Sequence, residues 1–331
     1  GAAEAELQPG PASNVVAGTD LTISVVICAY TLDRWSVLCE ACESVRAQLR
    51  EHDELILIID HNDELLARAR EALTGILVVP NADTRGLSGA RNTGVEVGKG
   101  RIVAFLDDDA TARPGWLESV RAGFTTASTA VVGTRVEPRW EGDRKPRWFP
   151  AEFGWVVGCS YRGQPTTRSA VRNPIGASMA IRRTAFAVAG TFSQVVGRVG
   201  ALPVGCEETE FCIRLAHRQP EAQVVFHPET AVDHLVPRQR QTVRYFLSRC
   251  FHEGRSKRAV ARLSGAGAAL SSERAYVRVT LPAAVLRGIS PTTLRREPAA
   301  FLQAIAVVAG LTATVAGYVS AARPRGVGKG S

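Results

Sequence analysis

Residues 102–109 read Ile-Val-Ala-Phe-Leu-Asp-Asp-Asp, so five apolar residues lead directly into three carboxylates. A short, partly β-branched apolar run is typical of a strand that is buried on both faces of a sheet. Three adjacent carboxylates repel one another, and a divalent cation with oxygen ligands removes that cost. The stretch therefore predicts a buried strand whose carboxyl end holds a metal and a diphosphate, with a solvated acidic turn as the alternative.

Strand-like and helix-like segments alternate upstream of this stretch. We expect strands at 21–29, 55–59 and 76–79, and helices at 33–48, 64–73 and 88–98. This alternation predicts an α/β fold with a mostly parallel central sheet flanked by helices. Polar side chains follow the expected strands, at Tyr30, Asp60, Asn81 and residues 107–109. Because the carboxyl ends of parallel strands share one edge of a sheet, a nucleotide should lie at that edge.

The second half of the chain has a mixed pattern. We expect short strands at 130–132 and 224–226, an irregular region at 138–172, and helices from Arg183 onward, at 207–217, 239–263, 274–287 and 298–321. These elements divide the chain into three parts. Residues 1–20 would be a flexible tail, residues 21–237 the domain that contains the sheet, and residues 238–331 a helical C-terminal extension.

Composition narrows the classes of function. The formal net charge of +8 and the pI near 9.4 indicate an anionic partner such as a nucleotide or an acidic lipid surface. We expect no nucleic-acid partner, since the sequence carries no RNA-binding or zinc-finger signature. Seven cysteines are an odd number, which favours a reducing compartment over a disulfide scaffold. Residues 1–20 carry no apolar secretory segment, and we therefore expect a cytoplasmic protein.

Four segments, in order, resemble the inverting glycosyltransferases of family 2, which have the GT-A fold. They are residues 24–30, a glycine-rich and acidic block at 85–109, the acidic segment 205–214, and His234. The resemblance covers about residues 21–258. It implies a metal-dependent hexosyltransferase that moves a sugar from a nucleotide-diphosphate sugar to an acceptor hydroxyl with inversion. A uridine nucleotide is the commonest donor in the family, so the implied donor is a UDP-sugar, for which we take UDP-glucose.

The resemblance also implies roles for individual residues. Asp109 and His234 would bind Mn²⁺ or Mg²⁺ as part of a DxD-type motif, whereas Asp107 or Asp108 would contact the ribose. Asp60 would accept hydrogen bonds from the nucleotide base. The other expected donor-binding residues are Ala29, Tyr30, Arg85, Gly86 and Arg91. Of these, Arg91 and the helix N-terminus beside it suit a phosphate.

Each of these roles has a structural alternative. Asp60 would also suit a helix N-cap. The glycines at 86, 89 and 94 would also allow tight packing of a helix on a strand. One of the three aspartates would then be purely structural, and a lone histidine such as His234 is usually a hydrogen-bonded structural group.

The acidic segment offers two candidates for the general base. The resemblance assigns the base to the second acid of a pair, which is Glu208, and leaves Glu207 as the other candidate. Most family members have aspartate at the position of Glu208. Glu207 and Glu210 would hold the loop and its neighbours. The alternative is that these acids only compensate the dipole at a helix start, for under about 1 kcal/mol each.

Residues 301–322 are nearly long enough to span a bilayer, but they include Gln303, Thr312 and Thr314. Arginines flank the segment on both sides, so the charge asymmetry of a true span is missing. We expect a docked helix or a contact with the inner face of the cell membrane. The acceptor is left open between a sugar, a lipid-linked molecule and a small molecule, and a homodimer is also compatible with the sequence.

Two further hypotheses compete with a sugar transferase. A nucleotidyltransferase also needs acids and a glycine-rich turn, but it normally has a lysine-containing glycine-rich signature after its first strand, and residues 29–33 read Ala-Tyr-Thr-Leu-Asp. An inactive, membrane-associated scaffold is the other. The presence of Asp109, Glu208 and His234 argues against an inactive protein.

Overall fold

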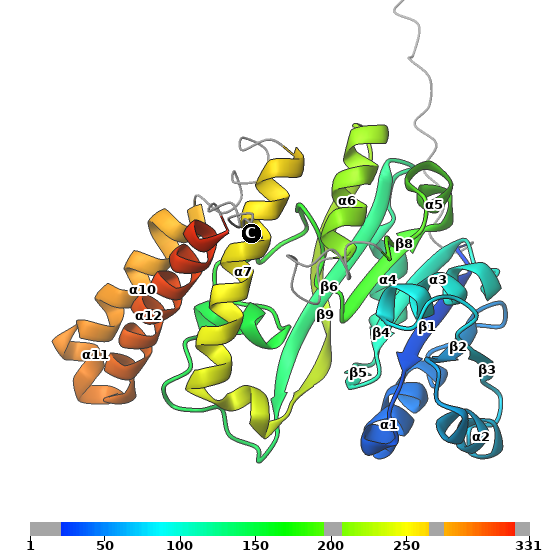
Figure 1. Cartoon of the computed structure of the whole chain (residues 1–331), viewed down its shortest axis with the longest axis horizontal. Helices are drawn as coiled ribbons and strands as arrows, with labels where there is room; N and C mark the ends of the chain where they lie inside the picture. Colours follow the sequence, from blue (N-terminus) through cyan, green and yellow to red (C-terminus); the bar gives the residue numbers. More distant parts are fainter. Residues whose placement is uncertain (1–20, 195–206, 265–274, 322–331) are drawn as a thin grey trace, which may run out of the picture.

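The computed structural model describes residues 21–194, 207–264 and 275–321. The expected N-terminal tail, 1–20, lies outside the described residues. One nine-stranded sheet carries helices on both faces, and a group of C-terminal helices lies at one end of the molecule (Figure 1). The α/β fold class predicted from the alternation of elements is therefore confirmed.

The sheet combines a parallel half with a mixed half. Its strand order is β3-β2-β1-β4-β8-β6-β9-β5, and β7 pairs with β9. The strands are β1 (Ile23–Ala29), β2 (Glu54–Ile59), β3 (Leu77–Pro80), β4 (Ile102–Asp107), β5 (Ala110–Ala112), β6 (Thr129–Trp140), β7 (Ser169–Ala170), β8 (Ser178–Arg182) and β9 (Gln223–Val236). The first four pair in parallel, as predicted. β8 then runs antiparallel to β4 and β6, while β9 is parallel to β6.

Hydrophobic clusters fill both faces of the sheet. The covering helices are α1 (Trp35–Arg46), α2 (Asp63–Ala72), α3 (Leu87–Val97), α4 (Trp116–Gly123), α5 (Arg183–Ala189) and α6 (Glu207–Arg218). In β1, Val25 and Ile27 pack with α1, α2 and α4, whereas Val26 packs with α3, α5 and α6. Successive strand residues point to opposite faces, so one apolar run serves both clusters. With both faces covered, the carboxyl ends of the parallel strands are left for polar side chains.

β9 is much longer than the predicted strand at 224–226. Pro228 and Glu229 interrupt its apolar run, which hides the second half from a search for continuous apolar residues. Burial resumes at Ala231, and this half pairs in parallel with the end of β6 and antiparallel with β5. The pairing sets His234 opposite Ala110. The short strand β5 and the helix α4 were not predicted.

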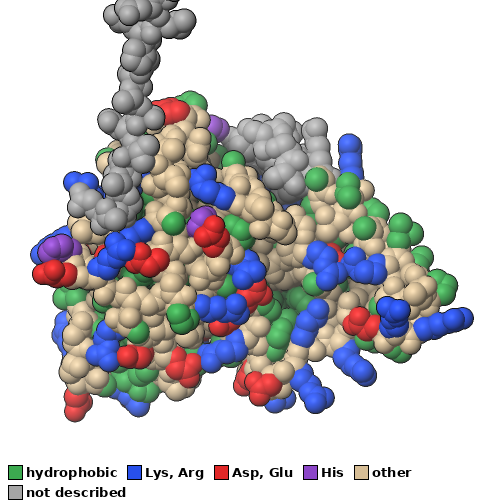
Figure 2. Space-filling model, turned by 180° about the vertical axis from the view of Figure 1, so that it is seen from behind, with side chains coloured by type: hydrophobic (Ala, Val, Ile, Leu, Met, Phe, Trp, Pro, Cys, Tyr) green, Lys and Arg blue, Asp and Glu red, His purple; other side chains and the backbone are tan. Residues whose placement is uncertain are grey.

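The C-terminal helices lie side by side at one end of the molecule (Figure 1, and from behind in Figure 2). They are α7 (Val243–Ser264), α10 (Leu281–Ile289), α11 (Pro291–Arg296) and α12 (Ala299–Ser320), with a π-helical segment, η5 (Tyr276–Thr280), before α10. α12 matches the prediction. The expected helix at 274–287 is also found, as η5 and α10; η5 is π-helical, and α10 ends before Pro291 begins α11.

α12 packs against α7 at very short range, because glycines face backbone oxygens. A Cβ atom added to Gly254 or Gly317 would lie 1.9 Å from the carbonyl oxygen of Thr314 or Phe251, respectively. Within the described residues, α12 is also the one helix that is long and apolar enough to cross a membrane. Three short 3-10 segments complete the described elements: η2 (Leu32–Arg34), η3 (Ala151–Val157) and η4 (Arg238–Gln241).

Candidate active site

Three predicted site residues meet where β4 ends. One ligand atom from each of Asp107, Asp109 and His234 lies within 4.8 Å of the others. Asp107 is the last residue of β4, and Asp109 directly precedes β5. His234 comes from β9, and its Nε2 atom is 3.2 Å from Oδ1 of Asp109. The structure thus joins the aspartate triplet to the histidine that the resemblance singled out, 125 residues further along the chain.

Positive side chains balance this acidic cluster. The Arg34 guanidinium lies 2.9 Å from Oδ1 of Asp108 and 2.7 Å from Oδ2 of Asp109. Burial opposes ionisation of Asp109, but the hydrogen bond and charge of His234 and the charge of Arg34 prevail and lower its pKa to about 2. Burial likewise disfavours charge on His234, yet the bond to Asp109 raises the pKa of the imidazole to about 10. Sequence reasoning missed Arg34, which lies 75 residues from its partner.

Burial raises the pKa of Asp107 and of Asp108, and neither carboxylate is fully compensated by its arginine neighbour. The pKa of the Asp108 carboxyl is raised to about 7, although the charge of Arg34 opposes that rise. Its Oδ2 atom is buried and has no hydrogen-bond partner among the described residues. Among the described residues, Oδ2 of Asp108 therefore remains available as an acceptor, whereas both carboxylate oxygens of Asp109 have cationic neighbours.

Arg91 lies next to the cluster, and its guanidinium is buried against the rings of Phe105 and Phe192. It donates to Oε1 of Glu207 at 2.9 Å and lies 3.4 Å from Oδ1 of Asp107. Arg91 thus ties α3 to the end of β4 and to the start of α6. It was predicted to bind donor phosphate, and the structure gives it carboxylate partners.

The two candidate bases have different surroundings. Glu207 is committed to the ion pair with Arg91. Burial, followed by the charge of Glu207, raises the pKa of Glu208 to about 8. Both residues begin α6. The first residues of the acidic motif, 205 and 206, lie outside the described part of the chain. Glu208 therefore has the raised proton affinity that a general base working near neutral pH needs.

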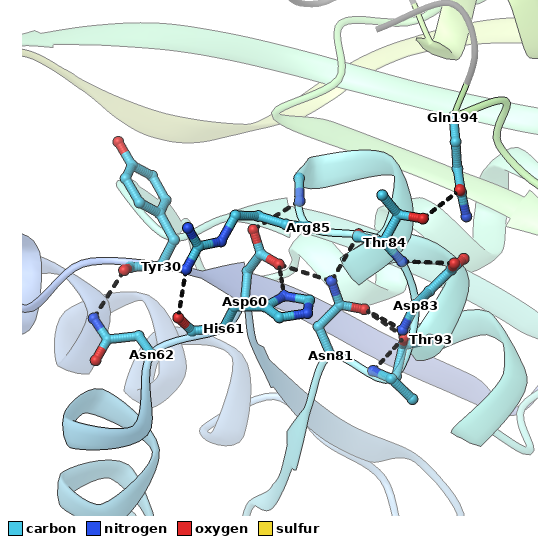
Figure 3. Close-up of polar contacts among 12 residues, drawn as sticks. Tyr30, Asp60, His61, Asn62, Asn81, Asp83, Thr84, Arg85, Thr93 and Gln194 are labelled. Atoms are coloured by element: carbon cyan, nitrogen blue, oxygen red, sulfur yellow. Dashed lines mark hydrogen bonds and ion pairs between the residues drawn. The ribbon is translucent and has the colours of Figure 1, made fainter. Parts of the chain in front are cut away.

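A second polar group lies at the ends of β2 and β3 (Figure 3). Oδ1 of Asp60 accepts a hydrogen bond from Nδ2 of Asn81 at 2.7 Å and lies 2.8 Å from Nδ1 of His61. Its Oδ2 accepts from the backbone N–H of Gly86 at 2.9 Å. Burial opposes ionisation, but these donors lower the pKa of Asp60 below its usual value. The N-cap of α2 is Asn62, so the alternative that Asp60 is a helix cap is wrong.

The glycines of the 86–94 block divide into two kinds. Gly86 has a φ of +123°, which favours glycine, and an added Cβ there would meet no atom within 4 Å. At Gly89 an added Cβ would lie 1.9 Å from the Thr84 carbonyl oxygen, and at Gly94 it would lie 2.4 Å from a methyl of Val26. Tight packing therefore explains Gly89 and Gly94. Gly86 instead leaves open space beside Asp60.

The remaining predicted donor-binding residues line the same edge. The Tyr30 side chain is 59% exposed, and its ring centroid lies 5.1 Å from the Arg34 guanidinium carbon. Arg85 is exposed and donates to the His61 carbonyl at 3.0 Å. Ala29 is buried and takes part through its carbonyl, which accepts the N–H of Asp60 at 2.8 Å. Tyr30 thus offers an exposed ring beside Arg34, which itself pairs with the acidic cluster.

Comparison with known proteins agrees with this geometry. The family model described as "Glycosyl transferase family 2" matches residues 24–189. A glucosyl-dolichyl phosphate glucuronosyltransferase from Haloferax volcanii is 35% identical over 72% of this chain and 77% of its own length. The succinoglycan biosynthesis protein ExoM from Rhizobium meliloti is 27% identical over 71% of this chain and 74% of its own.

A solved structure shares the fold. The mannosyltransferase PcManGT from Pyrobaculum calidifontis, determined in complex with GDP-Man and Mn²⁺, superposes with a TM-score of 0.54 at 15% identity. The match covers 94% of this chain and 79% of PcManGT. Together these findings set aside the nucleotidyltransferase and inactive-scaffold hypotheses. The chain belongs to glycosyl transferase family 2, has the GT-A fold, and is a glycosyltransferase.

Proposed function

We propose that this glycosyltransferase moves a sugar from a UDP-sugar to a hydroxyl of a lipid-linked acceptor, with inversion at the anomeric carbon and with a divalent metal. The observation that carries the proposal is the meeting of Asp107, Asp109 and His234 at the same sheet edge as Asp60. The lipid-linked acceptor is supported by the Haloferax volcanii relative, a glucosyl-dolichyl phosphate glucuronosyltransferase.

The donor set suits a divalent cation. Two carboxylates and one imidazole within 4.8 Å offer oxygen and nitrogen ligands that Mn²⁺ accepts readily and Mg²⁺ accepts less well. Asp109 and His234, with Asp107 as a third ligand, would hold the ion, and we assign Mn²⁺ on that chemistry. Asp107 then belongs to the metal in preference to the ribose. When bound, the cation would neutralise charge on the diphosphate leaving group.

We assign the acid–base step to Glu208. Its carboxylate would accept the proton of the acceptor hydroxyl as that oxygen attacks the anomeric carbon. Glu207 forms an ion pair with Arg91 at 2.9 Å. It would hold the start of α6 near the end of β4 and would not take the proton. A pKa near 8 makes Glu208 a stronger base than an ordinary carboxylate once it is ionised.

Asp60 and Tyr30 would bind the nucleoside. Oδ2 of Asp60 accepts one backbone hydrogen bond, from Gly86, and a carboxylate oxygen can accept a second, such as the imide N–H of uracil. The exposed Tyr30 ring can stack on the base. The open space at Gly86 lies beside Asp60, so a ligand can approach the backbone closely there.

The proposal is tested by a transfer assay with a dolichyl or polyprenyl phosphate glycoside as acceptor. UDP-glucose, UDP-glucuronate and GDP-mannose are offered in parallel, with Mn²⁺ and with EDTA, and NMR assigns the anomeric configuration of the product. We expect a β-linked product from an α-linked UDP-sugar, and only with the metal. Retention of configuration, or equal transfer in EDTA, would overturn the proposal. A preference for GDP-mannose would overturn the uridine assignment alone.

A further inference from the structure

Exposed apolar side chains are concentrated in the C-terminal helices. Fourteen large hydrophobic side chains are exposed in the described residues, and ten of them lie between residues 277 and 319. These ten are Val277, Val279, Leu286, Ile289, Phe301, Leu302, Ile305, Val308, Val315 and Val319. Isolated exposed apolar residues are normal on a soluble protein, but a contiguous group of this kind marks a surface that contacts something else.

The outer face of α12 is an apolar stripe along the whole helix. Phe301, Ile305, Val308, Val315 and Val319 follow the spacing of three or four residues that places them on one side. Along this side Thr312 is the one polar residue, and residues 299–320 contain no charged residue at all. The apolar stripe therefore runs from Phe301 to Val319, with an interruption at Thr312.

The inner face of α12 is occupied by the rest of the protein. Ala304, Val307 and Gly310 are buried, and Gly310 lies against Phe153 and Phe246. Because this side already has protein partners, the outer stripe is the part of α12 that is left without one. Within the described residues, nothing covers that stripe.

Basic residues accompany the stripe. Between residues 275 and 321 the chain has four arginines and one acid, Glu297. The arginines are Arg278, Arg287, Arg295 and Arg296. Figure 2 shows hydrophobic side chains interspersed with Lys and Arg at the end of the molecule that these helices form. Apolar side chains flanked by arginine complement a bilayer of anionic lipid, which offers acyl chains beneath a negative surface.

We propose that the outer face of α10–α12 docks on the surface of an anionic lipid bilayer. The apolar stripe of α12 would enter the boundary between headgroups and acyl chains, and the exposed Arg278, Arg295 and Arg296 would lie at the phosphates. This inference goes beyond the proposed function, since it requires no particular donor, acceptor or metal. It also fixes the catalytic domain relative to the membrane, as the contacts of η3 make clear.

The neighbours of α12 favour docking over crossing the membrane. α7 lies along its inner face, and Arg258 of α7 donates to the Tyr318 hydroxyl at 3.2 Å and faces its ring at 5.1 Å. The same helix carries an ion pair between Lys257 and Glu253. If α12 crossed the bilayer as packed here, these charges would enter the hydrocarbon at a large cost. Docking by the outer stripe leaves them in water.

The docking surface is firmly joined to the catalytic site through η3. The Tyr276 hydroxyl donates to the carbonyl of Glu152 at 2.6 Å, and Arg287 pairs with the Glu152 carboxylate. η3 ends at Gly158, where an added Cβ would lie 3.5 Å from the His234 ring. A bilayer bound to α10–α12 would therefore hold the active site at a set height above the membrane.

The test is vesicle sedimentation with the full chain. Vesicles of phosphatidylcholine alone are compared with vesicles of an equal mixture of phosphatidylcholine and phosphatidylglycerol. We expect the chain to sediment with the mixed vesicles. Ile305→Glu, at a position that is 50% exposed, should weaken this binding about tenfold or more, because a carboxylate must then enter the acyl boundary. Arg295→Gln with Arg296→Gln should weaken it about fivefold per arginine, and only with the anionic vesicles.

Leu77→Glu is the matched control, since Leu77 is 48% exposed on β3, far from these helices. It should bind vesicles like the wild type. Circular dichroism checks the fold of each variant, and Val315→Glu provides a second variant should Ile305→Glu fail to fold. Wild-type chain that stays in the supernatant with both vesicles would overturn the proposal. So would light scattering that shows a dimer in solution which Ile305→Glu dissociates, since a second copy would then cover the stripe.

Discussion

Two polar groups on one sheet edge are stabilised in different ways. In the acidic cluster at the end of β4, the positive side chains of Arg34 and His234 face the carboxylates of Asp108 and Asp109. The pKa is shifted to about 7 for Asp108, to about 2 for Asp109 and to about 10 for His234. In the group around Asp60, hydrogen-bond donors from Asn81, His61 and the Gly86 backbone surround a single carboxylate and lower its pKa below the usual value.

The contrast separates two kinds of binding. Hydrogen bonds hold Asp60 in one orientation before any ligand arrives, which suits recognition of a flat base. The acidic cluster instead has a protonated histidine and an arginine where a cation would give the same compensation. We infer that the Asp60 group confers affinity for the nucleoside, that the acidic cluster holds the diphosphate through a metal, and that Glu208 takes the proton in the chemical step.

The largest effect is expected at Glu208. Glu208→Gln keeps the shape of the side chain but cannot accept the hydroxyl proton, and a general base contributes about 10²–10⁴-fold. The single-turnover rate at saturating donor should decrease by a factor within that range, while the affinity for the donor stays unchanged. A loss of less than a few-fold would remove Glu208 from the chemistry.

Glu207→Gln is the control for that variant. It breaks the buried pair with Arg91, and removing one partner of such a pair costs about 3–5 kcal/mol of stability. We expect a lower melting temperature and a smaller effect on the chemical step. If Glu207→Gln alone shows the large kinetic loss, the base is Glu207 and the separation of roles between the two acids is reversed.

Asp60→Asn should weaken nucleoside binding about ten- to a hundredfold, since hydrogen bonds to a charged group contribute about 1.5–3 kcal/mol. Turnover at saturating donor should change little, because contacts to the base are equal in the ground state and the transition state. Calorimetry with uridine and UDP measures the affinity. Asp63→Asn, which changes an exposed acid in the first turn of α2, is the matched control and should bind normally.

The pH dependence should follow Glu208. The pKa of its carboxyl is raised to about 8, so the acid is protonated below that pH and cannot serve as a base. The rate of the chemical step should rise about tenfold per pH unit up to pH 8 and then level off. In Glu208→Gln the profile should be flat over this range. A wild-type rate that is independent of pH from 6 to 9 would contradict the assignment.

The same pKa has a consequence for stability. The folded chain binds this proton more tightly than the unfolded chain, whose glutamate has a pKa near 4.5. Between those two values the folded state carries more protons, so the contribution of Glu208 to stability falls as the pH rises. Glu208→Gln removes that penalty. Its melting temperature should exceed that of the wild type by a few degrees at pH 8.5 and by less at pH 5.

Much of the fold could be predicted because its signals are local. The apolar runs of β1, β2 and β4 are continuous, and the acids at 107–109 directly follow one of them. His234 was found through the order of family-like segments, although its strand was underestimated, because Pro228 interrupts the apolar pattern of β9. The expected division of the chain at residue 237 remains a prediction.

The rest depended on tertiary pairing. Arg34 meets Asp109 across 75 residues, and Arg91 meets Glu207 across 116. No pattern of residues in the neighbouring sequence predicts either contact. In the sequence, an arginine near a helix start resembles a group that binds an anionic ligand. In the fold, carboxylates of the protein itself already contact its guanidinium. The sequence also did not separate the two acids at the start of α6, whereas the ion pair of Glu207 does.

The central claim is that the acidic cluster binds the diphosphate through a metal, independently of the Asp60 group. The most direct test is isothermal titration calorimetry of UDP and uridine, with and without Mn²⁺, on the wild type and on Asp109→Asn. We predict that Mn²⁺ strengthens the binding of UDP to the wild type, has no such effect in Asp109→Asn, and leaves uridine affinity unchanged in both. An Asp109→Asn variant in which Mn²⁺ strengthens UDP binding as much as in the wild type would contradict the account.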